Sequence, residues 1–140
     1  MTRKLHTVLL IDDSEADNFI HARRIRKAGV AEEIVIKHNG REGIDYLRQT
    51  NPDGSHPQPE IVFLDINMPV MNGWEFLQEY AQLPEHQKAG TVVTMLTTSV
   101  ADTDRKRAAE YDDVVRYIEK PLTGDKLTEI ISEFYPDVLG

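Results

Sequence analysis

Five short apolar runs alternate with segments suited to helices, and this alternation restricts the fold of the chain more than its composition does. The runs that we expect to form strands cover residues 5–11, 34–38, 60–64, 91–96 and 114–119. The segments that we expect to form helices cover residues 14–28, 41–49, 72–82, 102–111 and a stretch beginning at residue 123. Short, nearly continuous apolar runs are typical of strands covered on both faces. We therefore predict an α/β fold, a doubly wound five-stranded parallel sheet in the order 2-1-3-4-5, with helices on both faces.

Length and charge limit the remaining possibilities. At 140 residues the chain is one domain long, so we expect a single domain over residues 1–140, with a core of about residues 5–135 and no effector domain. No apolar run approaches the ~18 residues of a membrane span, and the N-terminus lacks a signal-peptide core, which predicts a cytoplasmic protein without a membrane partner. The formal charge of −8 argues against nucleic acid as a partner. The turn-rich segment 51–59, with three prolines, is expected to be a surface loop.

Chemically useful side chains gather where the predicted strands end. In an open α/β sheet, ligands bind at the carboxyl ends of the strands, beside the point where the strand order reverses. The residues at those ends are Asp12 and Asp13 after the first strand, Asp65 after the third, Thr97 and Thr98 at the fourth, and Lys120 after the fifth. Because the first and third strands are neighbours in the predicted order, three carboxylates meet and repel one another at this edge.

Three clustered carboxylates must either raise their pKa values or hold a cation. An all-oxygen set with open water positions suits Mg²⁺, which is therefore the implied cofactor. With that ion bound, a carboxylate can attack a phosphoryl donor, while the metal and Lys120 neutralise charge on the transferring group and a Thr97 hydroxyl binds another phosphoryl oxygen. The set contains the groups needed to make an acyl phosphate.

Four stretches of the chain, in the same order along the sequence, match one known family. They are Val8-Leu-Leu-Ile-Asp-Asp-Ser, Phe63-Leu-Asp-Ile-Asn-Met-Pro-Val-Met-Asn-Gly, Leu96-Thr-Thr-Ser and Tyr117-Ile-Glu-Lys-Pro-Leu. On these motifs the chain resembles a bacterial two-component response-regulator receiver domain of the stand-alone, chemotaxis-receiver-like kind. The resemblance implies that Asp65 is the phosphoacceptor and that Lys120-Pro121 is a cis bond. It also implies that Asp13, Asp65 and the backbone carbonyl of Asn67 ligate Mg²⁺ and that Asp12 holds the ion mainly through water. Thr97 and Lys120 would sense the phosphoryl group, and Tyr117 would be the aromatic reporter of the switch.

Two departures from the family pattern leave questions open. The family usually has a small residue after the switch hydroxyl and a Gly-Ala pair before the fifth strand, whereas this chain has Thr98 and the stretch Glu110-Tyr-Asp-Asp. Either Thr97 or Thr98 could therefore face the phosphoryl group. The basic stretch 23–27 on the first predicted helix is either a solvated helix face or, as the family implies, a docking face for the phosphodonor protein.

The resemblance implies a phosphoacceptor rather than a conventional enzyme. Such a protein would accept a phosphoryl group from a histidine kinase or histidine phosphotransfer protein. It would then bind a downstream protein or a second copy of the chain through the face made by the predicted helix 102–111, strand 114–119 and last helix. A phosphohydrolase resembling the haloacid-dehalogenase group needs an acid two residues after its aspartyl nucleophile. This chain has Ser14 two residues after Asp12 and Asn67 two residues after Asp65, and neither can serve as that acid. The predicted strand order is flavodoxin-like, but a flavin-binding flavodoxin is rejected, because its first loop must bind a phosphate and the first loop here is acidic. An unphosphorylated protein-binding scaffold remains the alternative.

Overall fold

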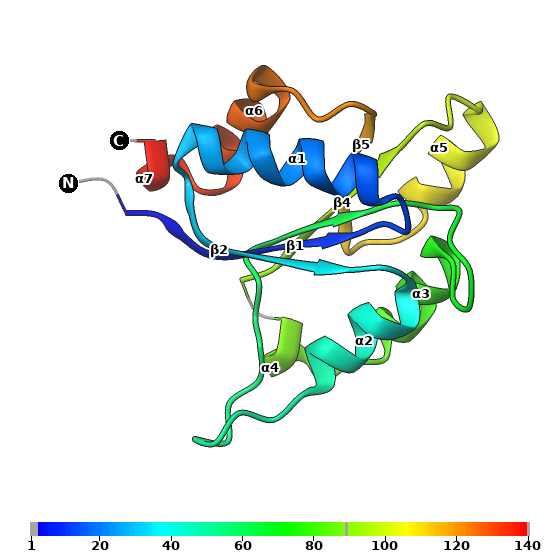
Figure 1. The fold of residues 1–140 in the computed structure, drawn as a ribbon. Coiled ribbons are helices and arrows are strands. Elements are labelled where there is room, and N and C mark those ends of the chain that lie inside the picture. The colour runs from blue at the N-terminus through cyan, green and yellow to red at the C-terminus, as the bar shows by residue number, and fades with distance from the viewer. Residues whose placement is uncertain (1–2, 89, 140) are drawn as a thin grey trace.

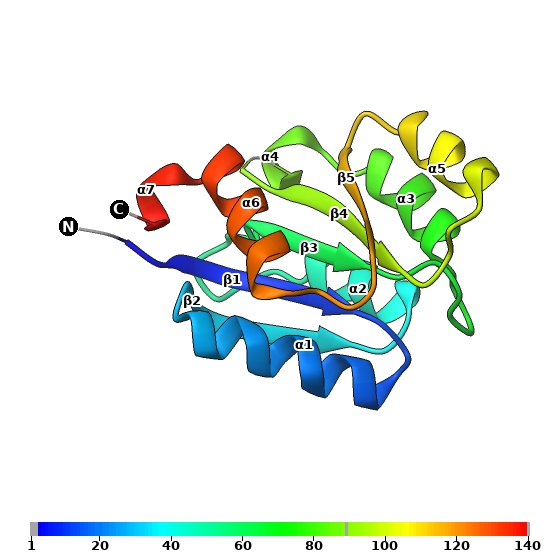
Figure 2. The same cartoon turned by 90° about the horizontal axis from the view of Figure 1, so that it is seen from above.

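A computed structural model describes residues 3–88 and 90–139 as one five-stranded parallel sheet with helices on both faces (Figures 1 and 2). The sheet order is β2-β1-β3-β4-β5, which confirms the predicted topology. The strands are β1 (Leu5–Ile11), β2 (Ala31–Lys37), β3 (Ile61–Leu64), β4 (Val92–Thr97) and β5 (Val114–Glu119). The second strand was predicted from residue 34 and in fact begins at Ala31. Its polar start, Glu32 and Glu33, is exposed, because β2 is an edge strand with one neighbour.

All five predicted helices form, and two short ones accompany them in the described part of the chain. The helices are α1 (Glu15–Ala28), α2 (Gly40–Arg48), α3 (Gly73–Ala81), α4 (Glu85–Lys88), α5 (Asp102–Ala109), α6 (Gly124–Phe134) and α7 (Pro136–Leu139). The predicted helix 102–111 is therefore α5, and the last predicted helix is α6. The segment between α2 and β3 is a surface loop, as predicted. None of the helices in the described residues is long and apolar enough to cross a membrane.

Two apolar layers hold the helices to the sheet, one on each face. Alternate residues of β1 point to opposite layers: Leu9 and Ile11 pack with α2, α3 and Ala108 of α5, whereas Val8 and Leu10 pack with α1, α6 and α7. This two-sided burial is the reason why the strands are nearly continuous apolar runs. Figure 1 shows α1, α6 and α7 on one side of the sheet and α2, α3 and α4 on the other.

Side chains at the helix starts set where the connecting loops lie. Ser14 is the N-cap of α1, where its Oγ accepts from the Asp17 N–H at 3.2 Å. Asn72 and Glu75 form a reciprocal capping box at α3. In contrast, Ala101 stands at the N-cap of α5 and offers no side-chain hydrogen bond. The helices on either side of the sheet therefore begin at fixed points, but α5 is less firmly held.

The start of α3 packs directly against the backbone that carries Asp65. The Gly73 N–H donates to the Ile66 carbonyl at 2.8 Å. A Cβ added at Gly73 would lie 2.4 Å from the Asp65 carbonyl oxygen and 3.0 Å from the Ile66 Cα. Only glycine allows this approach, because the atoms in the way are backbone atoms that cannot turn aside. The start of α3 thus fixes the position of the Asp65 backbone.

This contact predicts that Gly73→Ala destabilises the protein by about 1–3 kcal/mol, the usual cost of overpacking. Gly124→Ala is the matched control, since it also lies at the first position of a helix and its added Cβ would meet nothing within 4 Å. The control is expected to gain up to about 1 kcal/mol from better helix propensity. Urea unfolding of the three proteins measures both changes, and equal stability of the two variants would contradict the proposed backbone contact.

Candidate functional site

Three carboxylates meet at the carboxyl edge of the sheet, as the strand order predicts. One ligand oxygen of each of Asp12, Asp13 and Asp65 lies within 4.8 Å of the others. The backbone fixes two of them: the Asp12 N–H donates to the Lys37 carbonyl and the Asp65 N–H donates to the Ile11 carbonyl, both at 3.0 Å. Asp12 and Asp65 are buried, with 5% and 9% of their surface exposed, whereas Asp13 is exposed. The cluster therefore consists of two buried carboxylates and one that is exposed to solvent.

Lys120 brings the positive charge to this cluster. Its Nζ lies 2.6 Å from Asp12 Oδ2, 2.8 Å from Asp17 Oδ2 and 3.3 Å from Asp65 Oδ2. The Lys120 N–H donates to the Thr97 carbonyl at 2.8 Å, and the following Lys120-Pro121 bond is cis, as the resemblance implied. The ammonium has three N–H groups, so each of the three carboxylates can accept one of them.

Asp17 is a site residue that the sequence reasoning did not identify. It is the third residue of α1, where an acidic side chain usually folds back to accept the N–H of the N-cap residue. Here that N–H, from Ser14, is taken by Asp12 Oδ1 at 3.0 Å, and the Asp17 carboxylate turns to Lys120 instead. The sequence shows that Asp17 lies three residues after Ser14, but this spacing predicts a helix cap and not an ion pair with Lys120.

The pKa values of these groups follow from burial and charge. Burial alone would lower the pKa of Lys120, but its hydrogen bonds to Asp12 and Asp17 and the charge of Asp65 raise it above its ordinary value. Burial raises the pKa of Asp12, and the bond to Lys120 only partly opposes this effect. The bond to Lys120 lowers the pKa of the more exposed Asp17. The site therefore combines a firmly protonated ammonium with four carboxylates and carries an excess of negative charge.

This donor set fits a hard divalent cation. All three clustered ligands are carboxylate oxygens, and two are oriented by backbone donors: Ile66 N–H to Asp65 Oδ1 at 2.8 Å, and Ser14 N–H to Asp12 Oδ1. Oxygen ligands with room for water suit Mg²⁺. Asn67 lies two residues beyond Asp65 in the loop before α3, with an exposed side chain. Coordination by its backbone carbonyl stays a prediction.

Thr97 and Tyr117 meet at the backbone of Ser99. Thr97 is buried, 1% exposed, and its Oγ1 accepts from the Ser99 N–H at 3.2 Å, whereas Thr98 is exposed. The Tyr117 hydroxyl donates to the Ser99 carbonyl at 3.1 Å, and the Arg105 guanidinium lies 4.8 Å from the centre of the Tyr117 ring. Of the two threonines left open by the sequence, Thr97 is therefore the one tied to the strand end and to the tyrosine.

Helix α1 also holds the loop that follows Lys120. The buried His21 accepts from the Leu122 N–H through Nε2 at 3.3 Å, and Arg24 donates to the Leu122 carbonyl at 2.7 Å. Burial, together with the charge of Lys120, lowers the pKa of His21. Asn18 donates to the Asp12 carbonyl at 2.8 Å. One arginine of the basic stretch 23–27 thus has a structural role, while Arg23, Arg26 and Lys27 are exposed.

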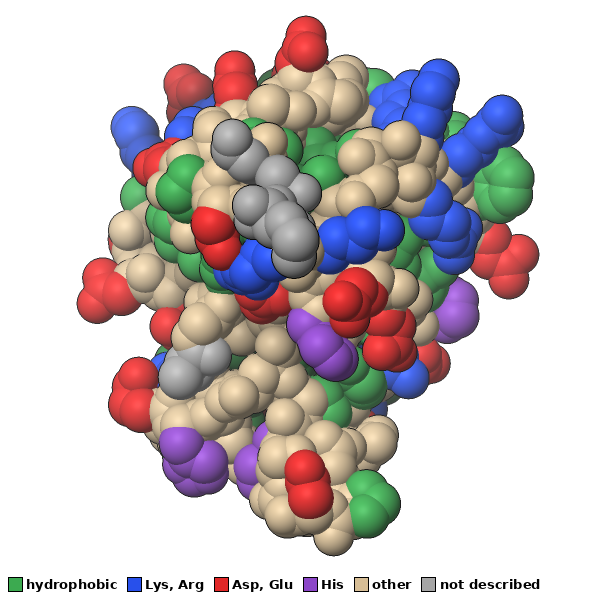
Figure 3. Space-filling view, turned by 90° about the vertical axis from the view of Figure 1, so that its left-hand side faces the viewer, with side chains coloured by type: hydrophobic (Ala, Val, Ile, Leu, Met, Phe, Trp, Pro, Cys, Tyr) green, Lys and Arg blue, Asp and Glu red, His purple; other side chains and the backbone are tan. Residues whose placement is uncertain are grey.

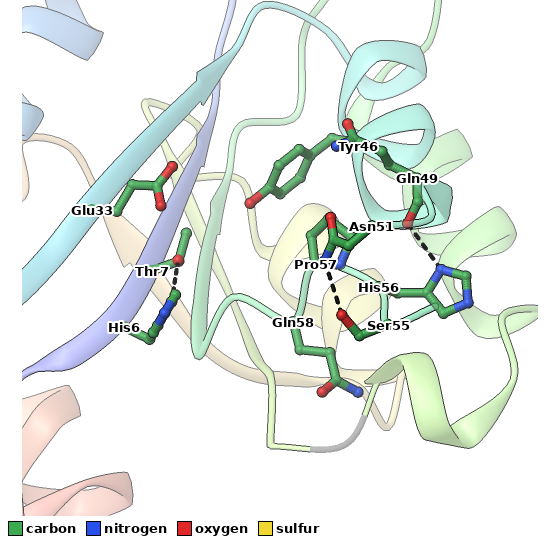
Figure 4. Close-up of a pocket in the computed structure, with 10 residues that line it drawn as sticks. All are labelled: His6, Thr7, Glu33, Tyr46, Gln49, Asn51, Ser55, His56, Pro57 and Gln58. Carbon is green, nitrogen blue, oxygen red and sulfur yellow. Dashed lines mark hydrogen bonds between the residues drawn. The ribbon is translucent and has the colours of Figure 1, made fainter. Parts of the chain in front are cut away.

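A larger hollow, of about 570 Å³, lies at the opposite end of the sheet (Figure 4). It is formed by the starts of β1 and β2, the end of α2 and the loop before β3, and it is lined by His6, Thr7, Glu33, Tyr46, Gln49, Asn51, Ser55, His56, Pro57 and Gln58. Figure 3 looks onto this end, where acidic, basic and histidine side chains are interspersed. None of the clustered aspartates lines this hollow. The candidate site was therefore identified from its charged side chains and not from the volume of a cavity.

One residue of the stretch that departs from the family pattern, Tyr111, packs against α3. Tyr111, in the segment before β5, stacks on Trp74 of α3 with ring centres 6.3 Å apart. Arg107 of α5 places its guanidinium 4.5 Å from the centre of the Trp74 ring. Trp74 and Phe76 are themselves buried in the core layer on this face of the sheet.

Comparisons with known proteins agree with this geometry. The model of the response regulator receiver domain matches residues 8–132. The probable methanogenesis regulatory protein FilR2 of Methanothrix harundinacea is 32% identical over 133 residues, which are 95% of this chain and 83% of that protein. A two-component response regulator from Cytophaga hutchinsonii is 34% identical, with a TM-score of 0.83 over 98% of both chains. The Mn²⁺-bound form of the response regulator Rcp1 is 27% identical, with a TM-score of 0.73 over 93% of this chain and 94% of that one. The chain belongs to the family of response regulator receiver domains.

Proposed function

We propose that this chain is a phosphorylation switch in which Asp65 accepts a phosphoryl group, with Mg²⁺, from a histidine kinase or a histidine phosphotransfer protein. The observation that carries the proposal is the joint position of Lys120 and the carboxylates. Lys120 Nζ lies 3.3 Å from Asp65 Oδ2, and Asp65 shares a cluster 4.8 Å across with Asp12 and Asp13. A nucleophile, a cation site and an ammonium are the parts that phosphoryl transfer to a carboxylate needs.

The transfer can be written with the residues at hand. A carboxylate oxygen of Asp65 attacks phosphorus, the bond between phosphorus and the donor's imidazole nitrogen breaks, and the electron pair stays on that nitrogen. Mg²⁺ held by Asp12, Asp13 and Asp65 would neutralise charge on the transferring oxygens, and the Mn²⁺-bound form of Rcp1 supports a divalent ion. The Lys120 N–H that faces Asp65 then binds a phosphoryl oxygen. The Thr97 hydroxyl accepts from Ser99, so its own proton is free to donate to another phosphoryl oxygen.

The phosphoacceptor can be tested with a small phosphodonor such as phosphoramidate. In the presence of Mg²⁺, mass spectrometry is expected to find one added phosphoryl group on the wild-type protein and none on Asp65→Asn. Asp125→Asn, which changes an exposed aspartate at the start of α6, should behave as wild type. Equal modification of the Asp65→Asn protein would refute the assignment.

The metal site predicts opposite effects for two neighbouring aspartates. Asp13 is exposed and has no side-chain hydrogen bond or ion pair to another described residue, so Asp13→Asn removes repulsion and should raise the melting temperature in metal-free buffer. Asp12 is paired with buried Lys120, so Asp12→Asn should lower it. Both variants should bind Mg²⁺ roughly tenfold or more weakly, since each loses a carboxylate that holds the ion directly or through water. Calorimetry and thermal melts measure these effects; unchanged Mg²⁺ affinity in both variants would count against a metal role.

The exposed surface of α1 beside the acidic cluster is the proposed docking face for the phosphodonor protein. Phe19 and Ile20 are 64% and 41% exposed, although they are large apolar side chains on a helix that starts at the site. The exposed Arg23 and Arg26 follow on the same helix. Apolar contact area with basic residues beside it is typical of a protein interface.

The output of the switch is proposed to leave through the face of α5, β5 and α6, toward a downstream protein or a second copy of the chain. Ser99 supports this route, because its N–H binds the Thr97 hydroxyl and its carbonyl binds the Tyr117 hydroxyl. A Thr97 hydroxyl drawn to a phosphoryl group would pull Ser99 and release Tyr117 on β5. That is a local charge change acting on a two-state element.

This route predicts different behaviour of two adjacent threonines. With Mg²⁺ and beryllofluoride, a phosphoryl mimic, amide exchange in α5, β5 and α6 should change in the wild type and in Thr98→Ala, whose hydroxyl is exposed. Thr97→Ala should still carry a phosphoryl group on Asp65 but lose the exchange response. A full response in Thr97→Ala, or changes restricted to α1, would show that the output face lies elsewhere.

The alternative of an unphosphorylated binding scaffold is less favoured because it gives no reason for the buried Lys120 and the clustered carboxylates. The proposal includes a cytoplasmic location and a role as phosphoacceptor instead of conventional enzyme.

A further inference from the structure

Lys120 has one more anionic partner than phosphoryl transfer requires. Asp12 and Asp65 belong to the carboxylate cluster that fits a metal ion, but Asp17 does not. Even so, Asp17 Oδ2 lies 2.8 Å from Lys120 Nζ, nearer than Asp65 Oδ2 at 3.3 Å. The ammonium of the unphosphorylated protein is thus held more closely by a residue of α1 than by the phosphoacceptor.

The local backbone directs Asp17 toward Lys120. The Ser14 N–H, which an acidic residue at this position of a helix normally accepts, already binds Asp12 Oδ1 at 3.0 Å. The Ser14 hydroxyl binds the Asp17 N–H and so fixes the first turn of α1. The Asp17 carboxylate, 36% exposed, is left to approach Lys120 from the solvent side.

The charges show what this extra carboxylate does. With a divalent ion bound, the positive charge of the ion and of Lys120 balances the negative charge of Asp12, Asp13 and Asp65. Asp17 adds one uncompensated negative charge at the place where a phosphoryl group would add more. It also occupies an N–H of Lys120 that a phosphoryl oxygen could use, since the ammonium has only three.

We propose that Asp17 is a positioning residue that holds Lys120 in its resting arrangement and thereby disfavours the phosphorylated state. The inference rests on the proposed function of Asp65. Phosphorylation then favours a shift of Lys120 from Asp17 toward the phosphoryl group, where a second N–H joins the one that faces Asp65, and the start of α1 becomes part of the switch. The strength of the Lys120 to Asp17 contact sets how readily the site accepts a phosphoryl group.

The test is the affinity of the site for beryllofluoride in the presence of Mg²⁺, measured by calorimetry. Asp17→Asn is expected to bind about two- to fivefold more tightly than wild type, the range for loss of one competing, partly exposed ion pair. Asp17→Ala is a second variant in case the first is poorly folded, and Asp17→Glu should restore wild-type affinity. In the metal-free protein, the ¹⁵N-detected ammonium protons of Lys120 should exchange with water faster in Asp17→Asn.

Glu15→Gln is the matched control, because it removes an exposed acidic charge two residues earlier in the same helical turn. It should leave both measurements unchanged. Tightening in Glu15→Gln as large as in Asp17→Asn would mean a general charge effect and would overturn the inference. So would equal or weaker binding in Asp17→Asn when the wild type binds. If the wild-type protein bound no beryllofluoride, the proposed function itself would fail.

Discussion

Repulsion among carboxylates, opposed by one buried ammonium, determines how the carboxyl edge of this sheet is built. Two unit charges about 4 Å apart interact by about 4 kcal/mol at an effective dielectric constant of about 20, against a total stability of about 5–15 kcal/mol for a domain. An unbalanced cluster could therefore consume much of that stability. The pKa of Lys120 is raised, which keeps the ammonium charged and the cluster tolerable. Contacts to the connecting loops accordingly hold Lys120 close to Asp65.

Those contacts come from both sides of the sheet. From one side, His21 and Arg24 of α1 bind the two backbone groups of Leu122 and hold the segment that follows Lys120. From the other, Gly73 lets α3 press against the backbone of Asp65 and Ile66. Removing charge or adding volume at these places affects the cluster indirectly, since the strands themselves are held by two apolar layers that do not include the acidic residues.

The strand order and the meeting of Asp12, Asp13 and Asp65 were predicted correctly, because the apolar runs alternate with helices, the order 2-1-3-4-5 is common in such sheets, and the aspartates end neighbouring strands. The role of Asp17 was not predictable from spacing, since an acid three residues after Ser14 is ordinarily a helix cap. Its redirection depends on a tertiary contact, the bond from Ser14 to Asp12. The stack of Tyr111 on Trp74 likewise depends on packing between distant segments. The spacing of residues along the sequence does not predict such tertiary contacts.

Among the five helices that the sequence predicted, α5 on the proposed output face has the fewest buried residues. Helix α5 has eight residues and buries only Ala108 among them, and its N-cap residue, Ala101, gives no side-chain cap. Its start depends on Ser99, whose hydroxyl binds Asp104 and whose backbone binds Thr97 and Tyr117. A helix with little buried apolar surface opens or shifts at low free-energy cost. A small displacement of Ser99 therefore acts first on α5, because the other long helices are held by side-chain caps and by several buried residues each.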